Sequence, residues 1–253
     1  MTDYKAKTQR RMMQWWQSPL GQYVLRQEKA VLSSFSQYFQ GEHQIQIGVN
    51  EHLLPKVLGS QCQKIMSPLA DLDGHYEHLP FKTRSINALL LVHVLEFSGD
   101  PHQVLREVER VLDMDGIVIV CAFNPWSLWG LRRLFSWRKN PPWQGTFFRR
   151  SRIKDWLALL NFDLIESQAL LFQPPIQNEK WFKRLDVMPQ WLQRYGSLFS
   201  GATVLIAQKR TLPLTPVKPQ WQTRSLFPSP RSPKLVNKEV NRTLLKEVLN
   251  EQG

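Results

Sequence analysis

The sequence predicts an α/β protein built on a parallel β-sheet, and two observations predict this class. Residues 86–92 and 117–123 are nearly unbroken apolar runs, as expected for strands that are buried on both faces. Between them, residues 101–112 place apolar side chains at helical spacing. A strand, a helix and a strand joined by short connections form a parallel, right-handed crossover.

The helix of this crossover has clear start and stop signals. Asp100 can cap the first free N–H groups, Pro101 suits the first helical position, and Gln103 completes a capping box. Gly116 ends the turn before the second strand. The apolar stripe of the helix consists of Val104, Leu105, Val108, Val111 and Leu112.

Further elements are predicted on both sides of the crossover. A helical segment is predicted from Trp15 to Tyr38, and Ser151 can cap a helix that runs through Asn161. Additional strands are predicted at residues 44–49, 64–66, 162–172 and 202–208.

Several short motifs occur in a fixed order around the two central strands. They are Gly74-His75-Tyr76-Glu77-His78-Leu79-Pro80-Phe81 before the first strand, His93-Val94-Leu95 after it, Leu105-Arg106-Glu107 and Arg110-Val111-Leu112 in the helix, and Asp113-Met114-Asp115-Gly116 before the second strand. In these motifs the chain resembles class I S-adenosylmethionine-dependent methyltransferases of the type 11 group, which includes quinone C-methyltransferases. The resemblance is good over residues 74–123 and extends more weakly from Trp15 to Arg210.

The resemblance implies a Rossmann-like fold with a seven-stranded, mostly parallel sheet, an antiparallel last strand and helices on both faces. It implies S-adenosylmethionine as the cofactor and methyl transfer to an acceptor that the sequence does not identify. A protein can retain a fold without the activity of its family, because a fold alone does not establish function. The alternative is therefore a non-catalytic descendant that binds a protein or nucleic-acid partner through its basic second half.

The resemblance also assigns the cofactor to particular residues. The family's first strand ends in an acidic residue and a Gly-x-Gly-x-Gly loop, whereas residues 47–52 of this chain keep one glycine. A tight turn in this loop would favour the methyltransferase, and a loop filled by Glu51 or His52 would favour the alternative. Three acidic positions of the family fall near Ser67 and on His75 and Asn87. The implied cofactor-binding residues are Gly48, Asn50, Ser67, His75, Tyr76, Glu77 and His93.

His93 and Glu96 are the predicted catalytic residues. The resemblance places His93 after the fourth family strand, beside the site of methyl transfer, and Glu96 follows as a base or as a partner for His93. The structural alternatives are that His93 caps the strand end and that Glu96 caps a helix. No metal site is expected, because His75 and His78 have the spacing of a ligand pair but lack a third ligand.

Four further residues are predicted to bind the acceptor. They are Trp15, Trp16, Asn124 and Trp126, since the resemblance implies that the N-terminal helix and the connection after the fifth family strand border the acceptor cleft. The alternatives are that the two N-terminal tryptophans plug the end of the core and that residues 124–126 only shape their loop.

The charge is distributed unevenly along the chain. Residues 1–120 carry 12 Lys and Arg against 13 Asp and Glu, whereas residues 121–253 carry 21 against 8. Residues 126–154 interleave aromatic and basic side chains. This segment can cover the cleft, and it can bind an anionic partner such as nucleic acid or a membrane surface. The simpler interpretation is that most of its aromatic residues pack while the arginines stay solvated.

The predicted organisation has three parts. Residues 1–40 form an N-terminal helical segment, residues 41–210 form the methyltransferase-like domain with its 126–154 insertion, and residues 211–253 form a Pro-rich, basic tail that is expected to be disordered. A short helix is possible at residues 237–250 of this tail, where it can dock on a partner.

Composition narrows the cellular setting. No apolar run approaches the roughly 20 residues that a transmembrane helix needs, and the N-terminus lacks a signal-peptide core. Cys62 and Cys121 are the only cysteines and are expected to be buried thiols rather than a disulfide. These features predict a cytoplasmic protein.

Overall fold

The computed structural model describes residues 11–55, 62–66, 71–72, 74–136, 141–171, 175 and 200–210. The chain divides into two compact units, residues 1–212 and 213–253, and all described residues belong to the first. The predicted Pro-rich tail therefore lies outside the described residues.

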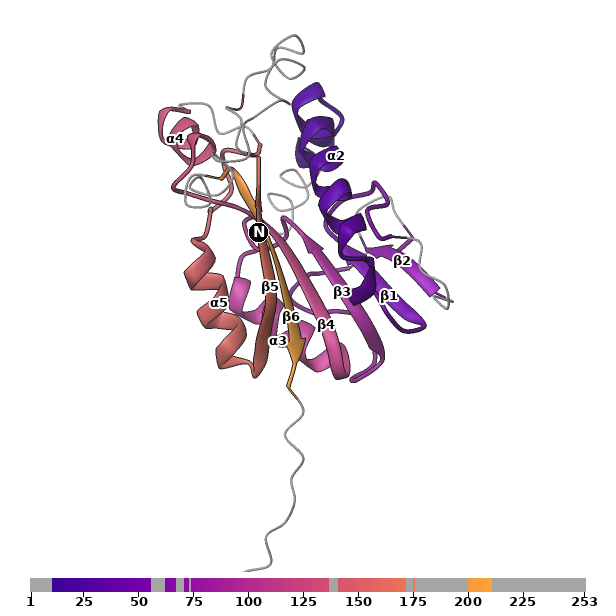
Figure 1. Ribbon diagram of the computed structural model, residues 1–253. Helices are drawn as coiled ribbons and strands as arrows, with labels where there is room; N and C mark the ends of the chain where they lie inside the picture. Colours follow the sequence, from indigo (N-terminus) through magenta and orange to yellow (C-terminus); the bar gives the residue numbers. More distant parts are fainter. Residues whose placement is uncertain are drawn as a thin grey trace, which may run out of the picture. The chain divides into compact units, whose positions relative to one another are not determined.

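A six-stranded sheet forms the centre of the first unit, in the order β2-β1-β3-β4-β6-β5 (Figure 1). The strands are β1 (His43–Ile47), β2 (Cys62–Met66), β3 (Ile86–Val92), β4 (Leu112–Phe123), β5 (Phe162–Leu170) and β6 (Ala202–Lys209). Strands β2, β1, β3 and β4 pair in parallel, and β6 runs antiparallel to both β4 and β5. The predicted mostly parallel sheet with an antiparallel last strand is confirmed.

The structure describes six strands where the resemblance implied seven. Within the described part of the chain, pairing on the outer side of β2 is a single parallel bridge between Met66 and Leu72. Residues 75–78 then turn back on themselves through an antiparallel bridge between His75 and His78, which leaves no extended run there. The second crossover strand was predicted to begin after a turn that ends at Gly116. In the structure β4 already begins at Leu112, and its pairing with β3 shifts register between Leu112 and Ile117.

Helices cover both faces of the sheet, as predicted (Figure 1). They are α2 (Pro19–Ser34), α3 (Pro101–Val111), α4 (Leu128–Phe135) and α5 (Arg150–Leu159), with a 3-10 turn at Ser36–Tyr38. On β3, Leu90 and Val92 belong to the core under α2, whereas Leu89 and Leu91 belong to the core under α3 and α5. This alternation follows from the two-residue period of a strand.

The predicted helical segment from Trp15 to Tyr38 is interrupted. A first helix covers residues 11–16, and a break at residues 17–18 separates it from α2. The Ser18 hydroxyl accepts a hydrogen bond from the Gly21 N–H (3.1 Å) and donates one to the Trp15 carbonyl (2.6 Å). Pro19 starts α2 because it has no N–H to donate to the preceding turn.

The structure partly tests two expectations, one about membrane-spanning helices and one about the cysteines. Among the helices that the structure describes, none is both long enough and apolar enough to cross a bilayer. Cys121 is a buried free thiol, as predicted, and burial raises its pKa well above the usual value. The side chain of Cys62 lies outside the described residues.

We expect Asp100→Ala to lower the free energy of unfolding by about 1 kcal/mol, because the Asp100 carboxylate caps α3. One carboxylate oxygen accepts from the N–H groups of His102 and Gln103, both at 3.0 Å. Urea unfolding measures the loss. Asp100→Asn keeps an acceptor oxygen and should keep most of the stability, so equal losses in the two variants would contradict the cap.

Candidate cofactor cavity and buried histidine cluster

The ends of three parallel strands meet at one edge of the sheet. β1 ends before Gly48, β3 before His93 and β4 before Asn124. In open α/β sheets, ligands bind outside the carboxyl ends of the strands. The candidate site is therefore built from the segments that follow these strands and from the helices that cover them.

The turn after β1 depends on its one glycine. Gly48 has a φ of +117°, and a Cβ at this position would lie 2.3 Å from the Val92 carbonyl oxygen. Its N–H donates to the Met66 carbonyl (3.1 Å). The single glycine thus forms a tight turn against β3, at the position where the family has its glycine-rich loop.

Gln46 holds the loop that follows this turn. No acidic residue ends β1; instead, the buried Gln46 amide donates to the carbonyls of Val49 (2.9 Å) and Glu51 (2.6 Å) and accepts from the Leu53 N–H (2.8 Å). Three hydrogen bonds from one buried side chain fix the backbone of residues 49–53. The sequence analysis missed this role, because Gln46 reads as an ordinary strand residue.

A cavity of about 460 Å³ lies against this loop. It is lined by Met13, Gln14, Trp16, Gln17, Gln22, Leu25, Val49, Asn50 and Glu51. The Gln22 amide donates to the Glu51 carboxylate (3.3 Å) and to the Trp16 carbonyl (3.0 Å). Glu51 therefore forms part of the wall, whereas His52 is exposed. The volume lies within the roughly 300–1,000 Å³ that is typical of small-molecule sites.

His93 lies between two carboxylates beneath the helices that border the cavity. Its Nε2 is 2.7 Å from Glu28 Oε1 on α2, and its Nδ1 is 2.9 Å from Glu96 Oε1. The same Glu96 oxygen accepts from the Phe123 N–H at the end of β4 (2.8 Å). All three side chains of this cluster, which we call the histidine cluster, are buried.

The two carboxylates keep His93 protonated. Burial disfavours the charged imidazole, but the charges and hydrogen bonds of Glu28 and Glu96 more than offset it and raise the pKa of His93 to about 10. The second oxygens of Glu28 and Glu96 are buried and have no hydrogen-bond partner among the described residues. The cluster thus places one imidazolium between two buried glutamate side chains.

Aromatic rings connect the histidine cluster to the cavity. The Phe123 ring stacks on His93, with centroids 3.9 Å apart, and the Trp16 ring lies 5.3 Å from His93. Trp16 also lines the cavity, and Trp15 packs against both Trp16 (4.6 Å) and Phe123 (6.4 Å). The structure therefore brings Trp15, Trp16, His93 and Glu96 together. Phe123 and Glu28 were not predicted, and no local signal in the sequence marks Glu28.

The predicted residues between β2 and β3 lie in a loop that faces α3. The Glu77 carboxylate accepts from the Gly99 N–H (2.9 Å), and the Glu77 carbonyl accepts from Gln103 (3.4 Å). Tyr76 is half-buried and His75 is exposed. None of the three lines the cavity. Ser67 lies outside the described residues.

Asn87 lies at the opposite edge of the sheet from the cavity. It is the second residue of β3, and its side-chain oxygen accepts a hydrogen bond from the His43 N–H at the start of β1 (3.1 Å). Among the described residues its contact is therefore with the amino end of a strand. Its alignment with a family acid does not bring it to the candidate site.

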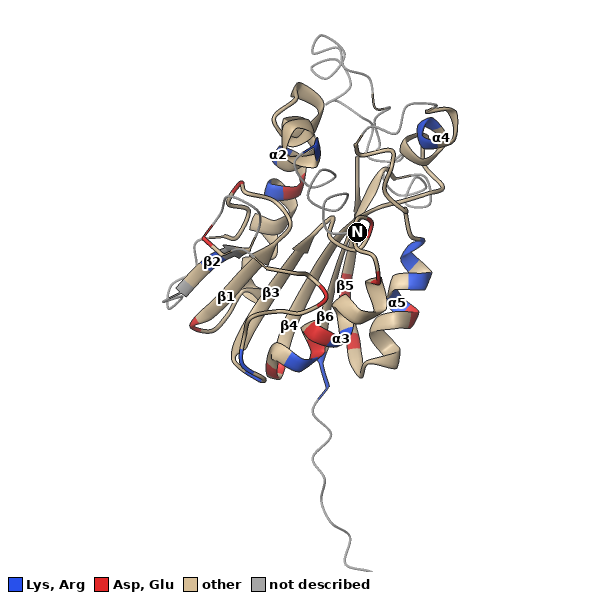
Figure 2. Ribbon diagram, turned by 180° about the vertical axis from the view of Figure 1, so that it is seen from behind, with Lys and Arg blue, Asp and Glu red and all other residues tan. Residues whose placement is uncertain are grey.

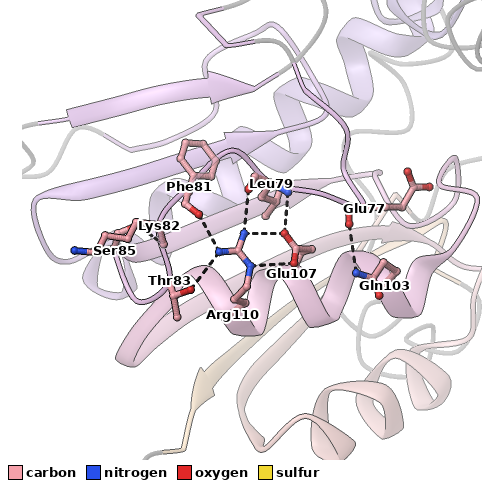
Figure 3. Close-up of polar contacts among 9 residues, drawn as sticks. All are labelled: Glu77, Leu79, Phe81, Lys82, Thr83, Ser85, Gln103, Glu107 and Arg110. Carbon is pink, nitrogen blue, oxygen red and sulfur yellow. Dashed lines mark hydrogen bonds and ion pairs between the residues drawn. The ribbon is translucent and has the colours of Figure 1, made fainter.

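Arg110 and Glu107 clamp the 79–83 segment onto α3 (Figure 3). The Arg110 guanidinium donates to the carbonyls of Leu79 (3.0 Å) and Phe81 (2.9 Å), and Glu107 accepts from the Leu79 N–H (2.9 Å). The hydrogen bond from Arg110 lowers the pKa of Glu107. These motif residues thus position the loop between β2 and β3.

The two predicted acceptor residues after β4 differ in burial: Asn124 is buried in a turn, and the Trp126 ring is exposed. The Asn124 side chain accepts from the Trp126 N–H (3.1 Å), and Asn124 itself is buried. Trp126 is 58% exposed, and the Arg149 guanidinium lies 4.5 Å from the centre of its ring. Neither residue lines the cavity.

Residues 36–120 match the family model of the methyltransferase domain. The match runs from the turn before β1 to most of β4. A curated relative, the uncharacterized protein YafS of Escherichia coli (strain K12), is 35% identical over 156 residues, which are 58% of each chain. The uncharacterized protein Rv2003c of Mycobacterium tuberculosis is 28% identical over 179 residues, 64% of this chain and 60% of the relative. The chain thus spans about three fifths of the length of these relatives.

Solved structures show the same fold. A methyltransferase from Thermotoga maritima, described as S-adenosylmethionine-dependent and as a possible histamine N-methyltransferase, superimposes with a TM-score of 0.57 at 19% identity, over 78% of this chain and 93% of its own. The [4+2]-cyclase SpnF superimposes with a TM-score of 0.53 at 12% identity, over 76% of this chain and 83% of its own. At these identities the likeness concerns the fold.

S-adenosylmethionine is the cofactor that this domain implies, and the described residues fit it. The cavity lies at the turn of Gly48 and has the volume of a small-molecule site. The sulfonium and the ammonium of S-adenosylmethionine are both cationic, and Glu51 places a carboxylate in the cavity wall. Asn50 adds a further polar side chain there.

We expect the stabilising effect of His93 to depend on pH. The pKa of His93 is raised in the folded protein to about 10 from its ordinary value of 6.5, so this contribution is complete below pH 6.5 and is lost as the pH rises toward 10. Across that interval it should fall by up to about 1.4 kcal/mol per pH unit. Urea unfolding at several pH values should therefore show a loss in His93→Gln that is larger at pH 6 than at pH 9.

A direct titration covers the case in which this variant fails to fold. Imidazole NMR signals of the unaltered protein should show His93 still protonated at pH 8, two units below its pKa of about 10. A neutral His93 at that pH would contradict the histidine cluster as described.

We expect Arg110→Ala to loosen the 79–83 segment, because it removes the hydrogen bonds to the carbonyls of Leu79 and Phe81. Hydrogen exchange at the Leu79 amide should become faster, and stability should fall by about 1 kcal/mol. Arg106→Ala is the matched control on the same helix, since Arg106 is exposed and bonds the Gln103 side chain. Equal effects of the two variants would show that the clamp does not hold the loop.

Proposed function

We propose that the protein is an S-adenosylmethionine-dependent methyltransferase whose cofactor binds in the cavity beside the Gly48 turn. The observation that carries this proposal is the position of the cavity. It borders the turn after β1, where the resemblance to methyltransferases implies the cofactor loop, and this turn is tight although it has only one glycine. Asn50 and Glu51 are the side chains that we assign to the cofactor. Tyr76, Glu77, His75 and Ser67 stay predictions.

When bound, S-adenosylmethionine would supply a methyl group on a sulfonium: the acceptor would bond to the methyl carbon as the C–S bond breaks and S-adenosylhomocysteine leaves. The protein contributes alignment and exclusion of water. Trp16 and Leu25 form an apolar wall of the cavity, and Glu51 offers a counter-charge to a cation. A carboxylate in such a partly enclosed wall acts more strongly on a cation than one in bulk water.

We assign His93 and Glu96 a positioning role in this reaction. Both ring nitrogens of His93 are occupied, one by Glu28 and one by Glu96, and the raised pKa keeps the ring protonated at neutral pH. A protonated imidazole that donates both protons has no lone pair with which to act as a base. The histidine cluster instead holds Trp16, through Phe123 and His93, at the wall of the cavity.

The acceptor side is proposed from the predicted residues that gather near His93. Trp15 and Trp16 reach this region through the first helix, and Asn124 follows β4 at the same edge of the sheet. We retain them as candidate acceptor-binding residues. Trp126, which is exposed, lies at the outer border of this region.

The non-catalytic alternative stays a prediction that no specific observation favours. The fold alone does not decide the reaction, as the superposition with a [4+2]-cyclase illustrates. Cofactor binding is therefore the property that has to be measured first.

We expect isothermal titration to detect S-adenosylmethionine and S-adenosylhomocysteine at micromolar dissociation constants. Glu51→Gln should weaken S-adenosylmethionine binding by about tenfold, equivalent to about 1.4 kcal/mol, because it removes the carboxylate from the cavity wall. Asp155→Asn, which removes an exposed carboxylate from α5, is the matched control and should bind as the unaltered protein does.

A second variant tests the turn. Gly48→Val should abolish binding, since a side chain here collides with the Val92 carbonyl; circular dichroism must show that this variant is folded. The proposal fails if the folded, unaltered protein gives no heat with either ligand. It also fails in its present form if Glu51→Gln and Asp155→Asn bind equally well.

A further inference from the structure

Helix α4 and the residue pair before it expose an unusual concentration of apolar side chains. Eight large apolar residues are exposed in the described part of the chain, and five of them lie within residues 126–135. These five are Trp126, Leu128, Leu131, Leu134 and Phe135, which we call the α4 face. Leu134 and Phe135 are 76% and 72% exposed. A contiguous exposed apolar patch of this kind usually marks an interaction site.

The α4 face is set by the packing of the helix. The leucines at 128, 131 and 134 and Phe135 follow three- and four-residue spacing, so they share one side of α4. The opposite side is anchored: Trp129 is buried and stacks on Phe123, with centroids 5.4 Å apart. A Cβ on Gly130 would lie 1.9 Å from the Pro125 carbonyl, so only glycine allows this close contact. The helix therefore cannot turn its apolar side inward without losing both contacts.

The α4 face belongs to a sequence segment that carries only positive charge. Residues 126–154 contain eight Lys and Arg and no Asp or Glu. Figure 2 shows the basic residues of α4 and of the first part of α5. Arg149, at the start of α5, lies over the Trp126 ring (4.5 Å), and Arg132 of α4 lies 5.1 Å from the Trp143 ring. Arg149 is thus held against an exposed ring of the α4 face, and Arg132 lies on the same helix as its leucines.

We propose that the α4 face docks on an anionic lipid bilayer, with α4 lying in the plane of the interface. Interfacial helices insert their apolar side among the acyl chains while basic residues contact anionic headgroups. Leu128, Leu131 and Leu134 supply the apolar contact, and Trp126 supplies an aromatic ring of the type that favours the headgroup region. The geometry thus matches both requirements of such a surface.

The observations favour a bilayer over the other candidate partners. Single-stranded nucleic acid stacks its bases on aromatic rings, whereas three of the five residues of the α4 face are leucines. A second copy of this chain on a two-fold axis would bring two basic patches into one interface, and residues 126–154 offer no acidic side chain to pair with them. An anionic membrane meets the apolar side chains and the arginines together.

The test is sedimentation of the full chain with lipid vesicles, in the absence of S-adenosylmethionine. One set of vesicles contains phosphatidylcholine alone, and the other also contains about one third phosphatidylglycerol. The protein should bind the anionic set at least about tenfold more tightly, and binding should weaken at high salt.

Two variants separate the α4 face from charge elsewhere in the chain. Leu131→Glu combined with Leu134→Glu should lower binding to anionic vesicles by at least about tenfold, because both side chains lose their apolar contact and add negative charge. Leu159→Glu is the matched control, since Leu159 is at least as exposed as the two leucines of α4 but lies at the end of α5, and it should bind normally. All substituted positions are exposed, so the variants should fold.

Three results would overturn the proposal. They are no binding to anionic vesicles, equal binding by the double variant and the unaltered protein, and preferential binding of a single-stranded oligonucleotide that is lost in the double variant. The last result would identify nucleic acid as the partner instead. Because the test needs no cofactor, its failure would leave the proposed methyltransferase function standing.

Discussion

The structure around the candidate site depends on the histidine cluster of Glu28, His93 and Glu96. It joins three segments that are distant in the sequence: α2 through Glu28, the end of β3 through His93, and the end of β4 through the Phe123 N–H that Glu96 accepts. Each charged group is buried and needs the others, because removing one partner of a buried ion pair costs about 3–5 kcal/mol. The cluster therefore determines where α2 lies over the sheet.

The cavity follows from the position of α2. Leu25 and Gln22 line the cavity and lie one and two turns before Glu28 on the same helix, so the contact that fixes Glu28 also fixes them. The break at Ser18 then turns the first helix so that Trp16 reaches both the cavity and His93. On the other side, Gln46 holds the backbone of the loop that carries Glu51. Two buried polar side chains, Gln46 and Glu28, thus support opposite walls.

The crossover of β3, α3 and β4 could be predicted because its signals are local: apolar strands, a capped helix and a turn. His93 and Glu96 could be assigned to a site because a short motif places them. Glu28 could not, since its partner lies 65 positions away and nothing near Glu28 distinguishes it from a surface acid. Gln46 was missed because a strand pattern does not reveal what a buried amide bonds. The resemblance implied a seventh strand, whereas the described residues 75–78 form a local turn.

The aromatic segment after β4 shows why composition could not assign its residues to core or surface. Trp126 and Trp129 are three positions apart, yet one is 58% exposed and the other 1%. The difference arises from Gly130, which lets α4 approach Pro125 and sets the rotation of the helix. Because Trp129 stacks on Phe123, and Phe123 stacks on His93, the rotation of α4 is tied to the histidine cluster. The same packing that organises the cavity therefore turns the leucines of α4 outward, so that the α4 face and the candidate site are two consequences of one arrangement.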